Sequence, residues 1–289
     1  MKGIILLGGS GTRLHPSTKV ISKQLIPIYD KPMCYYSLSI LFLAGIRDIL
    51  VISTPHDILL YEQLLGDGSQ WGVNFTYIVQ ASPEGLPQAF TLGASFIGND
   101  SVMLVLGDNI FYGNGLVRQL TSATVLNSGA TAFAYRVPDP QRFGVVEIDL
   151  NGQALSIEEK PQDPKSHFAL VGLYICDNNV VQYSKELVKS TRGEYEIVDI
   201  LKRYMILNSL KVEKLGRGIS WLDTGTHDSL LQASNFVQTI QQRQGLSVAC
   251  LEEIAYTQGW IDKDKLLTLI SLMKNNPYSQ YLEQLIEEI

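Results

Sequence analysis

A glycine-rich loop, GGSGTR at residues 8–13, directly follows an apolar segment at the start of the chain. Its glycines let the backbone curl tightly and turn N–H groups toward an anion, and a helix N-terminus behind it would favour phosphate further. The spacing of the loop excludes two common phosphate-binding motifs. Leu14 stands where a dinucleotide fingerprint needs its third glycine, and Thr12-Arg13 stands where a P-loop needs Lys followed by Ser or Thr. The loop therefore predicts a phosphate site of another kind; the alternative is a tight turn that binds nothing.

Basic side chains lie within this loop and shortly after it. Lys19 and Lys23 belong to the segment KVISKQLIP at residues 19–27, which must pass near the loop. Arg13 and Lys23 together could neutralise a triphosphate tail, because each donates charge-assisted hydrogen bonds to phosphate oxygens. Ordinary solvated lysines are the alternative.

Two aspartates stand at the ends of apolar runs. Asp108 follows LVLG at residues 104–107, and an acid at the exposed end of a buried strand is costly unless it is paired or binds a cation. Asp223 follows a second, shorter apolar run and precedes a glycine turn. Mg²⁺ takes one or two carboxylates together with phosphate oxygens, and strand ends distant in sequence can meet at one sheet edge. We therefore expect both aspartates to bind Mg²⁺; a turn or N-cap role is the alternative for Asp223.

The segment EEKP at residues 158–161 follows another predicted strand. Glu159 offers a carboxylate for sugar hydroxyls, and Lys160 offers an ammonium for a phosphate. From these residues alone, a solvated charge cluster explains the segment better.

Alternating strands and helices in the first half of the chain must position these residues. Unbroken apolar runs predict parallel strands that are buried on both faces, and the repetition implies right-handed crossovers and a doubly wound sheet. The helix near 56–65 has readable ends, with Thr54 as N-cap, Pro55 at the first helical position and Gly66 just past the end. The predicted strands are 2–7, 49–53, 75–80 and 102–106, and the helices lie near 34–44, 56–65 and 87–97.

The pattern changes after about residue 130. From about residue 227 onward the chain is mostly helical, and Asn276-Pro277 marks the start of the last helix. We expect an α/β fold with a doubly wound, mostly parallel mixed sheet, a small sheet extension and a helical C-terminal part, divided into a core at 1–226 and a helical region at 227–289. The strands of the extension, which precede one obvious helix, are 131–136, 145–149, 155–158 and 168–175.

Composition argues against several classes of protein. The net charge is −6 over 289 residues, so attraction to nucleic acid is not expected. Cys34, Cys176 and Cys250 form no CxxC pair and indicate reduced thiols in a cytoplasmic protein, and the scattered histidines argue against a transition-metal site. The apolar runs at 1–7 and 38–43 are too short to span a membrane.

These motifs occur together and in order from about residue 2 to about residue 260. In this density they resemble the glucose-1-phosphate thymidylyltransferases of bacterial deoxysugar synthesis; relatives that use UTP or ATP share the first loop only in altered form. The resemblance implies a Rossmann-like nucleotidyltransferase fold and a homotetramer built as a dimer of dimers. The motifs that carry it are GGSGTRL, SKQLIPIYDKPM, Gln80 with SPEGL, LGDNIFYG, FGVVE, EEKP, RGEYEI and WLDTGT.

The resemblance also implies roles for individual residues. The triphosphate set is Gly8, Gly9, Gly11, Thr12, Arg13 and Lys23. Thymine would be recognised at Gln80 and Gly85, with Gln24 nearby, and Mg²⁺ would be bound by Asp108 and Asp223. The glucosyl pocket matches Asn109, Gly144, Glu159 and Val171, and the sugar phosphate matches Lys160 with Arg192 close to it.

The implied reaction is Mg²⁺-dependent transfer of a thymidylyl group from dTTP to α-D-glucose 1-phosphate, giving dTDP-glucose and pyrophosphate for dTDP-deoxysugar synthesis, for example of rhamnose and O-antigen. The attacking phosphate oxygen is already an anion, so no general base or covalent intermediate is required. Catalysis would then rest on positioning and on neutralisation of charge by Arg13, Lys23 and Lys160 and by the Mg²⁺ that Asp108 helps to bind. The open alternatives are UTP or another hexose 1-phosphate as substrate, and a catalytically silent subunit that only binds nucleotide sugars.

Two regions depart from the family pattern. Leu7 stands beside the glycine loop where Ala is usual, and a larger side chain there could shift the base or loosen nucleotide choice. The family commonly carries a regulatory nucleotide-sugar site between subunits, near residues 244–260. In that stretch Leu251 replaces Pro and Thr257 replaces Arg, which removes a phosphate partner and argues against feedback inhibition.

Overall fold

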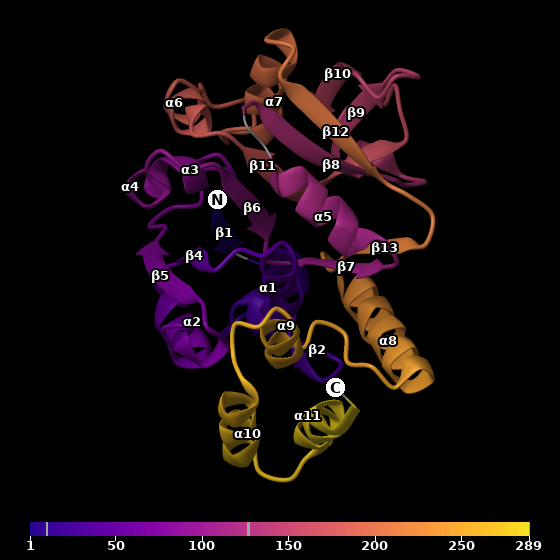
Figure 1. Ribbon diagram of the computed structural model, residues 1–289. Coiled ribbons are helices and arrows are strands. Elements are labelled where there is room, and N and C mark those ends of the chain that lie inside the picture. The colour runs from indigo at the N-terminus through magenta and orange to yellow at the C-terminus, as the bar shows by residue number, and fades with distance from the viewer. Residues whose placement is uncertain (10, 126–127, 289) are drawn as a thin grey trace.

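A mixed β-sheet of nine strands forms the centre of the molecule (Figure 1), and the computed structural model describes residues 1–9, 11–125 and 128–288. Ser10 of the glycine loop lies outside these ranges. The strands are β1 Lys2–Leu7, β4 Asp48–Ser53, β5 Asn74–Val79, β6 Val102–Leu106, β8 Ala130–Arg136, β9 Gly144–Ile148, β10 Ala154–Glu159, β11 Phe168–Cys176 and β12 Leu210–Leu215. Each predicted strand lies within one residue of an observed strand at both ends.

The sheet runs in the order β10, β9, β11, β6, β1, β4, β5, with β8 paired to β11 and β12 paired to β8. Strands β6, β1, β4 and β5 are mutually parallel, whereas β11 is antiparallel to β6, β8 and β9. The predicted α/β fold with a doubly wound mixed sheet is therefore confirmed. One detail is wrong: β5 is an edge strand, and Val79 at its end is 42% exposed, so β5 is not buried on both faces.

Alternate side chains of the central strands enter two hydrophobic cores, one on each face of the sheet. Ile5 and Val105 belong to one core, and their neighbours Ile4 and Leu104 belong to the other. The first core is covered by α1 Met33–Leu43, α2 Ile58–Leu65 and α5 Leu116–Thr124; the second is covered by α3 Gln88–Leu92, α4 Ala94–Ile97, α6 Asn179–Lys185 and α7 Ile197–Ile206.

Three helix predictions need correction. Thr54 Oγ1 does accept a hydrogen bond from the Asp57 amide at 3.2 Å, but residues 55–57 form a turn, so α2 begins after Asp57 and Thr54 is not its N-cap. The helix expected at 87–97 is divided at Gly93, where a Cβ would lie 2.9 Å from the carbonyl oxygen of Ala89. Two helices, α6 and α7, follow β11 where one was expected.

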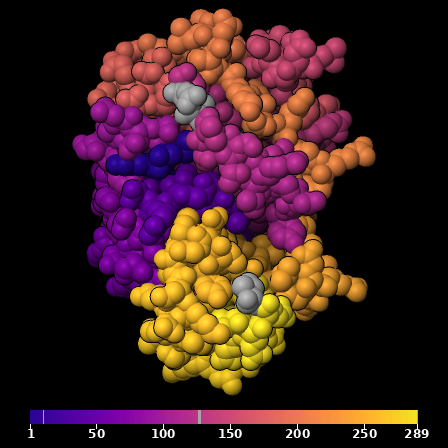
Figure 2. Space-filling view, in the orientation of Figure 1, coloured from indigo at the N-terminus to yellow at the C-terminus, as the bar shows by residue number. Residues whose placement is uncertain are grey.

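Four helices form the C-terminal part of the chain, and the predicted last helix is confirmed. Asn276 Oδ1 accepts hydrogen bonds from the amides of Tyr278 and Ser279, which starts that helix. Figure 1 shows these helices below the sheet, and in Figure 2 they form the lower part of the visible face. The last three pack into the same core as α1; the boundary at residues 226–227 stays a prediction. The helices are α8 His227–Gln244, α9 Leu251–Thr257, α10 Lys263–Leu272 and α11 Pro277–Glu288.

None of the helices within the described ranges is long and apolar enough to cross a membrane.

Two short antiparallel ribbons stand apart from the main sheet. One pairs β2 Pro27–Ile28 with β3 Lys31–Pro32, and the other pairs β7 Asn109–Gly113 with β13 Ile219–Asp223. In the second ribbon Asp223 lies opposite Asn109. The expectation that Asp108 and Asp223 end strands of one sheet is therefore wrong, because Asp223 reaches the site from this separate ribbon.

Candidate active site

The glycine loop leaves the carboxyl end of β1 and turns sharply. Gly9 and Gly11 have φ values of 110° and 57°, which L side chains rarely adopt. Gly8 has no room for a side chain, because a Cβ would lie 2.9 Å from Oε1 of Gln80. Behind the loop stands a single 3₁₀ turn, Thr12–Leu14, rather than an α-helix, so the expected helix-dipole contribution to phosphate binding is small.

A chain of three hydrogen bonds, the first two of them buried, supports the loop from the side of η2 (Lys23–Leu25). The Tyr61 hydroxyl donates to Ser22 Oγ at 2.7 Å, and Ser22 donates to Gln24 Oε1 at 2.8 Å. Gln24 Nε2 then donates to the carbonyl oxygen of Gly8 at 3.2 Å. The structure thus makes Gln24 a support of the loop, while its nearness to a base stays a prediction.

Gln80 and Gly85 both lie in the loop between β5 and α3. Gln80 is 2% exposed and donates from Nε2 to Gln88 Oε1 at 2.6 Å, which directs its Oε1 toward Gly8. Gly85 has a φ of 119° and pairs with Tyr195, whose backbone a Cβ would strike. Gly85 is therefore required by a close contact between two loops, and base recognition by either residue stays a prediction.

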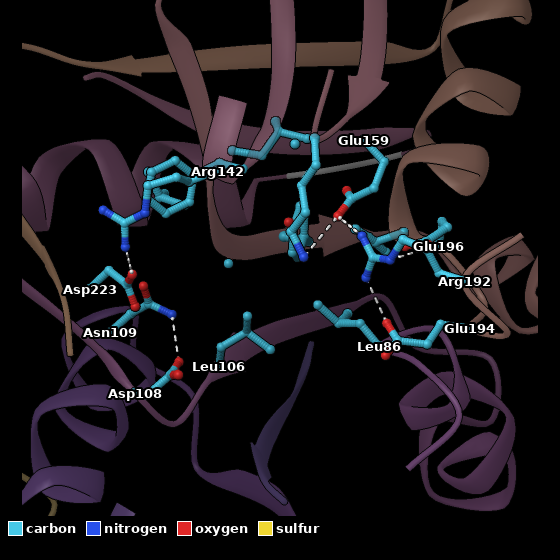
Figure 3. Close-up of a pocket in the computed structure, with 18 of the residues that line it drawn as sticks. Leu86, Leu106, Asp108, Asn109, Arg142, Glu159, Arg192, Glu194, Glu196 and Asp223 are labelled. Atoms are coloured by element: carbon cyan, nitrogen blue, oxygen red, sulfur yellow. Dashed lines mark hydrogen bonds and ion pairs between the residues drawn. The ribbon is translucent and has the colours of Figure 1, made fainter. Parts of the chain in front are cut away.

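Two adjacent pockets surround the end of β6. The smaller, of about 210 Å³, is lined by the glycine loop together with Lys23 and Gln24. The larger, of about 580 Å³, is lined by residues from β9, β10, β11 and β13 and is shown in Figure 3. Arg13 and Asp108 line both, so a molecule in one pocket would meet a molecule in the other at these two side chains.

Asp108 is held in place from three sides at this junction. Lys23 Nζ donates to its Oδ2 at 2.6 Å, and Asn109 Nδ2 donates to its Oδ1 at 3.2 Å. The hydroxyl of Thr224 donates to the backbone oxygen of Asp108 at 2.8 Å, which ties β6 to the loop after β13. The segment 19–27 does pass the glycine loop, and Lys23 is 7% exposed rather than a solvated lysine.

Asp223 lies close enough to Asp108 for the two carboxylates to repel each other. Burial raises the pKa of Asp223 above its ordinary value, and the charge of Asp108 adds to the rise. The charges of Lys23, Arg13 and Arg142 oppose it. Oxygen donors that repel each other in this way suit a hard divalent cation such as Mg²⁺. Within the described ranges no group of three or more His, Cys, Asp or Glu side chains is arranged to hold a metal ion by itself, so a cation here would complete its shell with substrate oxygens or water.

The opposite wall of the larger pocket carries a second charged cluster (Figure 3). Arg192 donates to Glu159 Oε1 at 3.0 Å and to Glu194 at 2.8 Å, and lies 3.7 Å from Glu196. Lys160 Nζ lies 3.6 Å from the same Glu159 oxygen, and the backbone of Lys160 has a φ of 41°. Glu159 and Lys160 of the EEKP segment therefore line a pocket, whereas Glu158 is half-buried outside it and pairs with Lys165 at 2.9 Å.

Two further predicted residues shape this pocket without offering charge. Gly144 begins β9, and a Cβ there would lie 3.3 Å from Glu159 Oε2. Val171 is fully buried in β11 and lines the pocket. All the residues predicted for the sugar phosphate thus surround one cavity, whereas those predicted for the triphosphate surround its neighbour.

Several residues that line the pocket were not predicted from the sequence, and three of them make contacts that shape the site. Trp221 donates from Nε1 to Asn109 Oδ1 at 2.6 Å, and its place two residues before Asp223 on one strand could have indicated that both face the same side. Arg142 contacts Asp223 Oδ2 at 3.4 Å, and no sequence signal identified it. Gly172 has a φ of 68° inside β11, where a Cβ would lie 2.8 Å from Asn109 Nδ2.

Comparison with known proteins places this geometry in a family. The family model described as nucleotidyl transferase matches residues 2–240. A glucose-1-phosphate thymidylyltransferase of Neisseria meningitidis serogroup A is 57% identical over 288 residues, which is 100% of both chains. That of Mycobacterium tuberculosis H37Rv is 53% identical over 287 residues and 99% of each chain. The chain belongs to the glucose-1-phosphate thymidylyltransferase family.

Solved structures agree with membership of this family and its nucleotidyltransferase fold. A Bacillus anthracis protein assigned to the glucose-1-phosphate thymidylyltransferases, in complex with sucrose, superposes with a TM-score of 0.76 at 41% identity over 82% of this chain and 94% of that one. A UDP-glucose pyrophosphorylase bound to UDP-glucose has a TM-score of 0.73 at 22% identity over 83% of this chain and 98% of that one, which shows a shared fold. This member of the thymidylyltransferase family is thus an enzyme that transfers nucleotidyl groups.

Leu7 lies at the end of β1, directly before the glycine loop. Its side chain is fully buried in the core on one face of the sheet and packs against Gly107, where a Cβ would collide with it. Gly107 directly precedes Asp108. An effect of Leu7 on substrates would therefore pass through the backbone before Asp108, and its effect on nucleotide choice stays a prediction.

Proposed function

We propose that this enzyme transfers a thymidylyl group from dTTP to α-D-glucose 1-phosphate in the presence of Mg²⁺, giving dTDP-glucose and pyrophosphate. The observation that carries the proposal is the junction of two pockets at Arg13 and Asp108, with Asp223 beside them. One pocket has the backbone of a phosphate loop, and the other has carboxylates and cations suited to a phosphorylated sugar. The curated relatives described above carry the name of this reaction.

The triphosphate binds in the smaller pocket. The amides of the glycine loop face its oxygens, and Arg13 and Lys23 neutralise the β- and γ-phosphates, which leave as pyrophosphate. Lys23 is paired with Asp108 in the free protein, so it must exchange this partner for a phosphate oxygen.

The sugar phosphate binds in the larger pocket. Glu159 and Asn109 accept and donate hydrogen bonds to sugar hydroxyls, while Lys160 and Arg192 hold the phosphate. The phosphate oxygen attacks the α-phosphorus in line; because it is already deprotonated, no side chain has to remove a proton. Two anions that repel each other are thereby fixed at reacting distance, which is the main contribution of the residues to the rate.

Asp108 and Asp223 are the residues that would hold Mg²⁺. A bound Mg²⁺ supplies positive charge that neutralises phosphate oxygens of both substrates.

The experiment is release of pyrophosphate with dTTP and glucose 1-phosphate by wild type, Asp108→Asn and Arg13→Ala. Both variants should lose activity by orders of magnitude while the thermal midpoint stays near that of wild type. Asp100→Asn is the matched control, because Asp100 lies at the opposite end of β6 and is exposed. Wild-type rates in either site variant would contradict the proposal. Faster turnover with UTP than with dTTP, or with another hexose 1-phosphate than with glucose 1-phosphate, would show that the proposed substrate is wrong.

The wider context is proposed on the resemblance alone. We place dTDP-glucose at the start of dTDP-deoxysugar synthesis, such as that of rhamnose and O-antigen, in a cytoplasmic homotetramer. Feedback inhibition through the C-terminal helices is not expected, since the Thr257 hydroxyl is used within α9, where it donates to the Glu253 carbonyl at 2.9 Å. Strong inhibition by a dTDP-deoxysugar would show that this expectation is wrong.

A further inference from the structure

Each of the two aspartates at the junction is already paired with a cation of the protein itself. Lys23 Nζ lies 2.6 Å from Asp108 Oδ2, and Arg142 Nη2 lies 3.4 Å from Asp223 Oδ2. The Lys23 pair is largely buried, and the Arg142 pair lies at the rim, where Figure 3 shows the guanidinium directed at Asp223.

Arg13 adds a third cation to this group. Gly225 separates Arg13 from Asp223: a Cβ at Gly225 would lie 3.2 Å from Arg13 Nη1 and 3.2 Å from both carboxylate oxygens of Asp223. Three positive side chains therefore face the two aspartates before any ligand binds, and one of the three, Arg142, is shared with Asp139. A divalent cation that entered alone would meet carboxylates that are already neutralised, and it would be repelled by the cations that neutralise them.

A nucleoside triphosphate changes this balance because it brings about four negative charges to the same place. Its oxygens offer Lys23 and Arg13 new partners, and Asp108 is then released to a metal ion. The metal and the nucleotide each remove a cost of binding the other, which is a coupling free energy between two ligands and must act in both directions.

We infer that Lys23 and Arg142 act as resident counter-cations, so that a divalent ion binds the free protein weakly and binds strongly only together with the triphosphate. The inference rests on the proposed function for the identity of the ligands. It adds that these side chains set the affinity for the metal, as antagonists of the ion and not as its ligands.

Arg142 is the residue on which to test this, because Lys23 is part of the triphosphate site. Its side chain is 47% exposed, and Asp139 binds the same guanidinium at 2.9 Å. Arg142 also lies over the ring of Phe143, at 5.1 Å from its centre. Arg142 can therefore leave Asp223 and keep its contacts with Asp139 and Phe143. Removing its charge should leave Asp223 without this ion pair and should not disturb the fold.

The test is a titration of the free protein with Mn²⁺, followed by electron paramagnetic resonance of the unbound ion, with no sugar phosphate present. Arg142→Gln should bind Mn²⁺ about two- to fivefold more tightly than wild type, the range expected for loss of a partly exposed ion pair. Arg142→Lys, which keeps the charge, and Arg118→Gln, which removes an exposed arginine on α5, should both behave as wild type.

Water-proton relaxation then compares Mn²⁺ on the protein with and without dTTP, because the slow tumbling of the ternary complex distinguishes it from Mn²⁺ on free nucleotide. Wild type should show tighter Mn²⁺ binding with dTTP, and Arg142→Gln should show a smaller gain. Equal or weaker Mn²⁺ binding by Arg142→Gln than by wild type, or a wild-type affinity that dTTP leaves unchanged, would overturn the inference. Neither titration requires turnover, so absence of dTDP-glucose in the activity assay would refute the proposed function separately.

Discussion

Trp221→Phe tests whether the indole of Trp221, which lines the larger pocket, orients Asn109. The indole Nε1 donates to Asn109 Oδ1 at 2.6 Å, and Asn109, which is 4% exposed, donates in turn to Asp108 at 3.2 Å. Phe keeps the packing against Phe143 and Tyr135, whose rings lie 5.2 and 6.0 Å away, but removes the donor. A buried acceptor that loses its donor costs about 1–3 kcal/mol, which corresponds to roughly 5- to 150-fold in an equilibrium.

That cost should appear in kcat/KM for the sugar phosphate, because the Asn109 amide is then free to turn away from Asp108 and from the pocket. The assay is steady-state pyrophosphate release with each substrate varied in turn, together with a thermal midpoint. Trp71→Phe is the matched control: it removes an indole donor to buried Glu252 at 3.0 Å, far from the pocket, and should lower stability alone. An unchanged kcat/KM in Trp221→Phe, with a loss of stability like that of Trp71→Phe, would refute the reasoning.

Three further substitutions test the larger pocket, the smaller pocket and the C-terminal helices in turn. Gly172→Ala should raise KM for the sugar phosphate and lower stability by about 1–2 kcal/mol. The substitution forces Ala to a φ of 68°, and its Cβ would lie 2.8 Å from Asn109 Nδ2. A variant with wild-type KM and thermal midpoint would contradict this. Gly8→Ala should raise KM for dTTP and leave KM for the sugar phosphate unchanged, because its Cβ would lie 2.9 Å from Gln80 Oε1; equal increases in both KM values would oppose the separation into two pockets. Burial raises the pKa of Glu253, so the native protein holds this proton more tightly than the unfolded chain, and stability is lost as pH rises from about 4.3 through the raised pKa. Glu253→Gln stays neutral and should therefore exceed wild type in thermal midpoint at pH 7 but little at pH 4; calorimetry showing the reverse order would contradict the direction.

The first half of the fold was readable from the sequence because its strands are continuous apolar runs. Runs such as 2–7 and 102–106 are buried in the centre of the sheet, and their boundaries follow from hydrophobicity alone. The edge strand β5 has a similar composition but a different environment, which composition does not report. The break at Gly93 was also hidden, because it depends on how closely that residue packs on the sheet.

The site was readable where its residues follow strands within conspicuous motifs. Arg13 and Asp108 line both pockets, Lys23 lines the smaller one and Glu159 the larger one, while their roles in catalysis stay predictions. The ribbon that carries Asp223 could not be predicted from the sequence, because pairing between β7 and β13 joins segments about a hundred residues apart. Arg142 lies outside any motif with its own chemistry, and its role depends on a contact that only the folded chain makes.

The most direct test of the account follows the α-phosphate. The enzyme is incubated with dTTP labelled with ³²P at the α position, glucose 1-phosphate and Mg²⁺, and the products are separated by chromatography; a parallel reaction carries the label at the γ position. We predict that the α label appears in dTDP-glucose and the γ label in pyrophosphate, in equal amounts. Release of the α label as free dTMP, or retention of both labels in dTTP, would contradict the transfer of a thymidylyl group to the sugar phosphate.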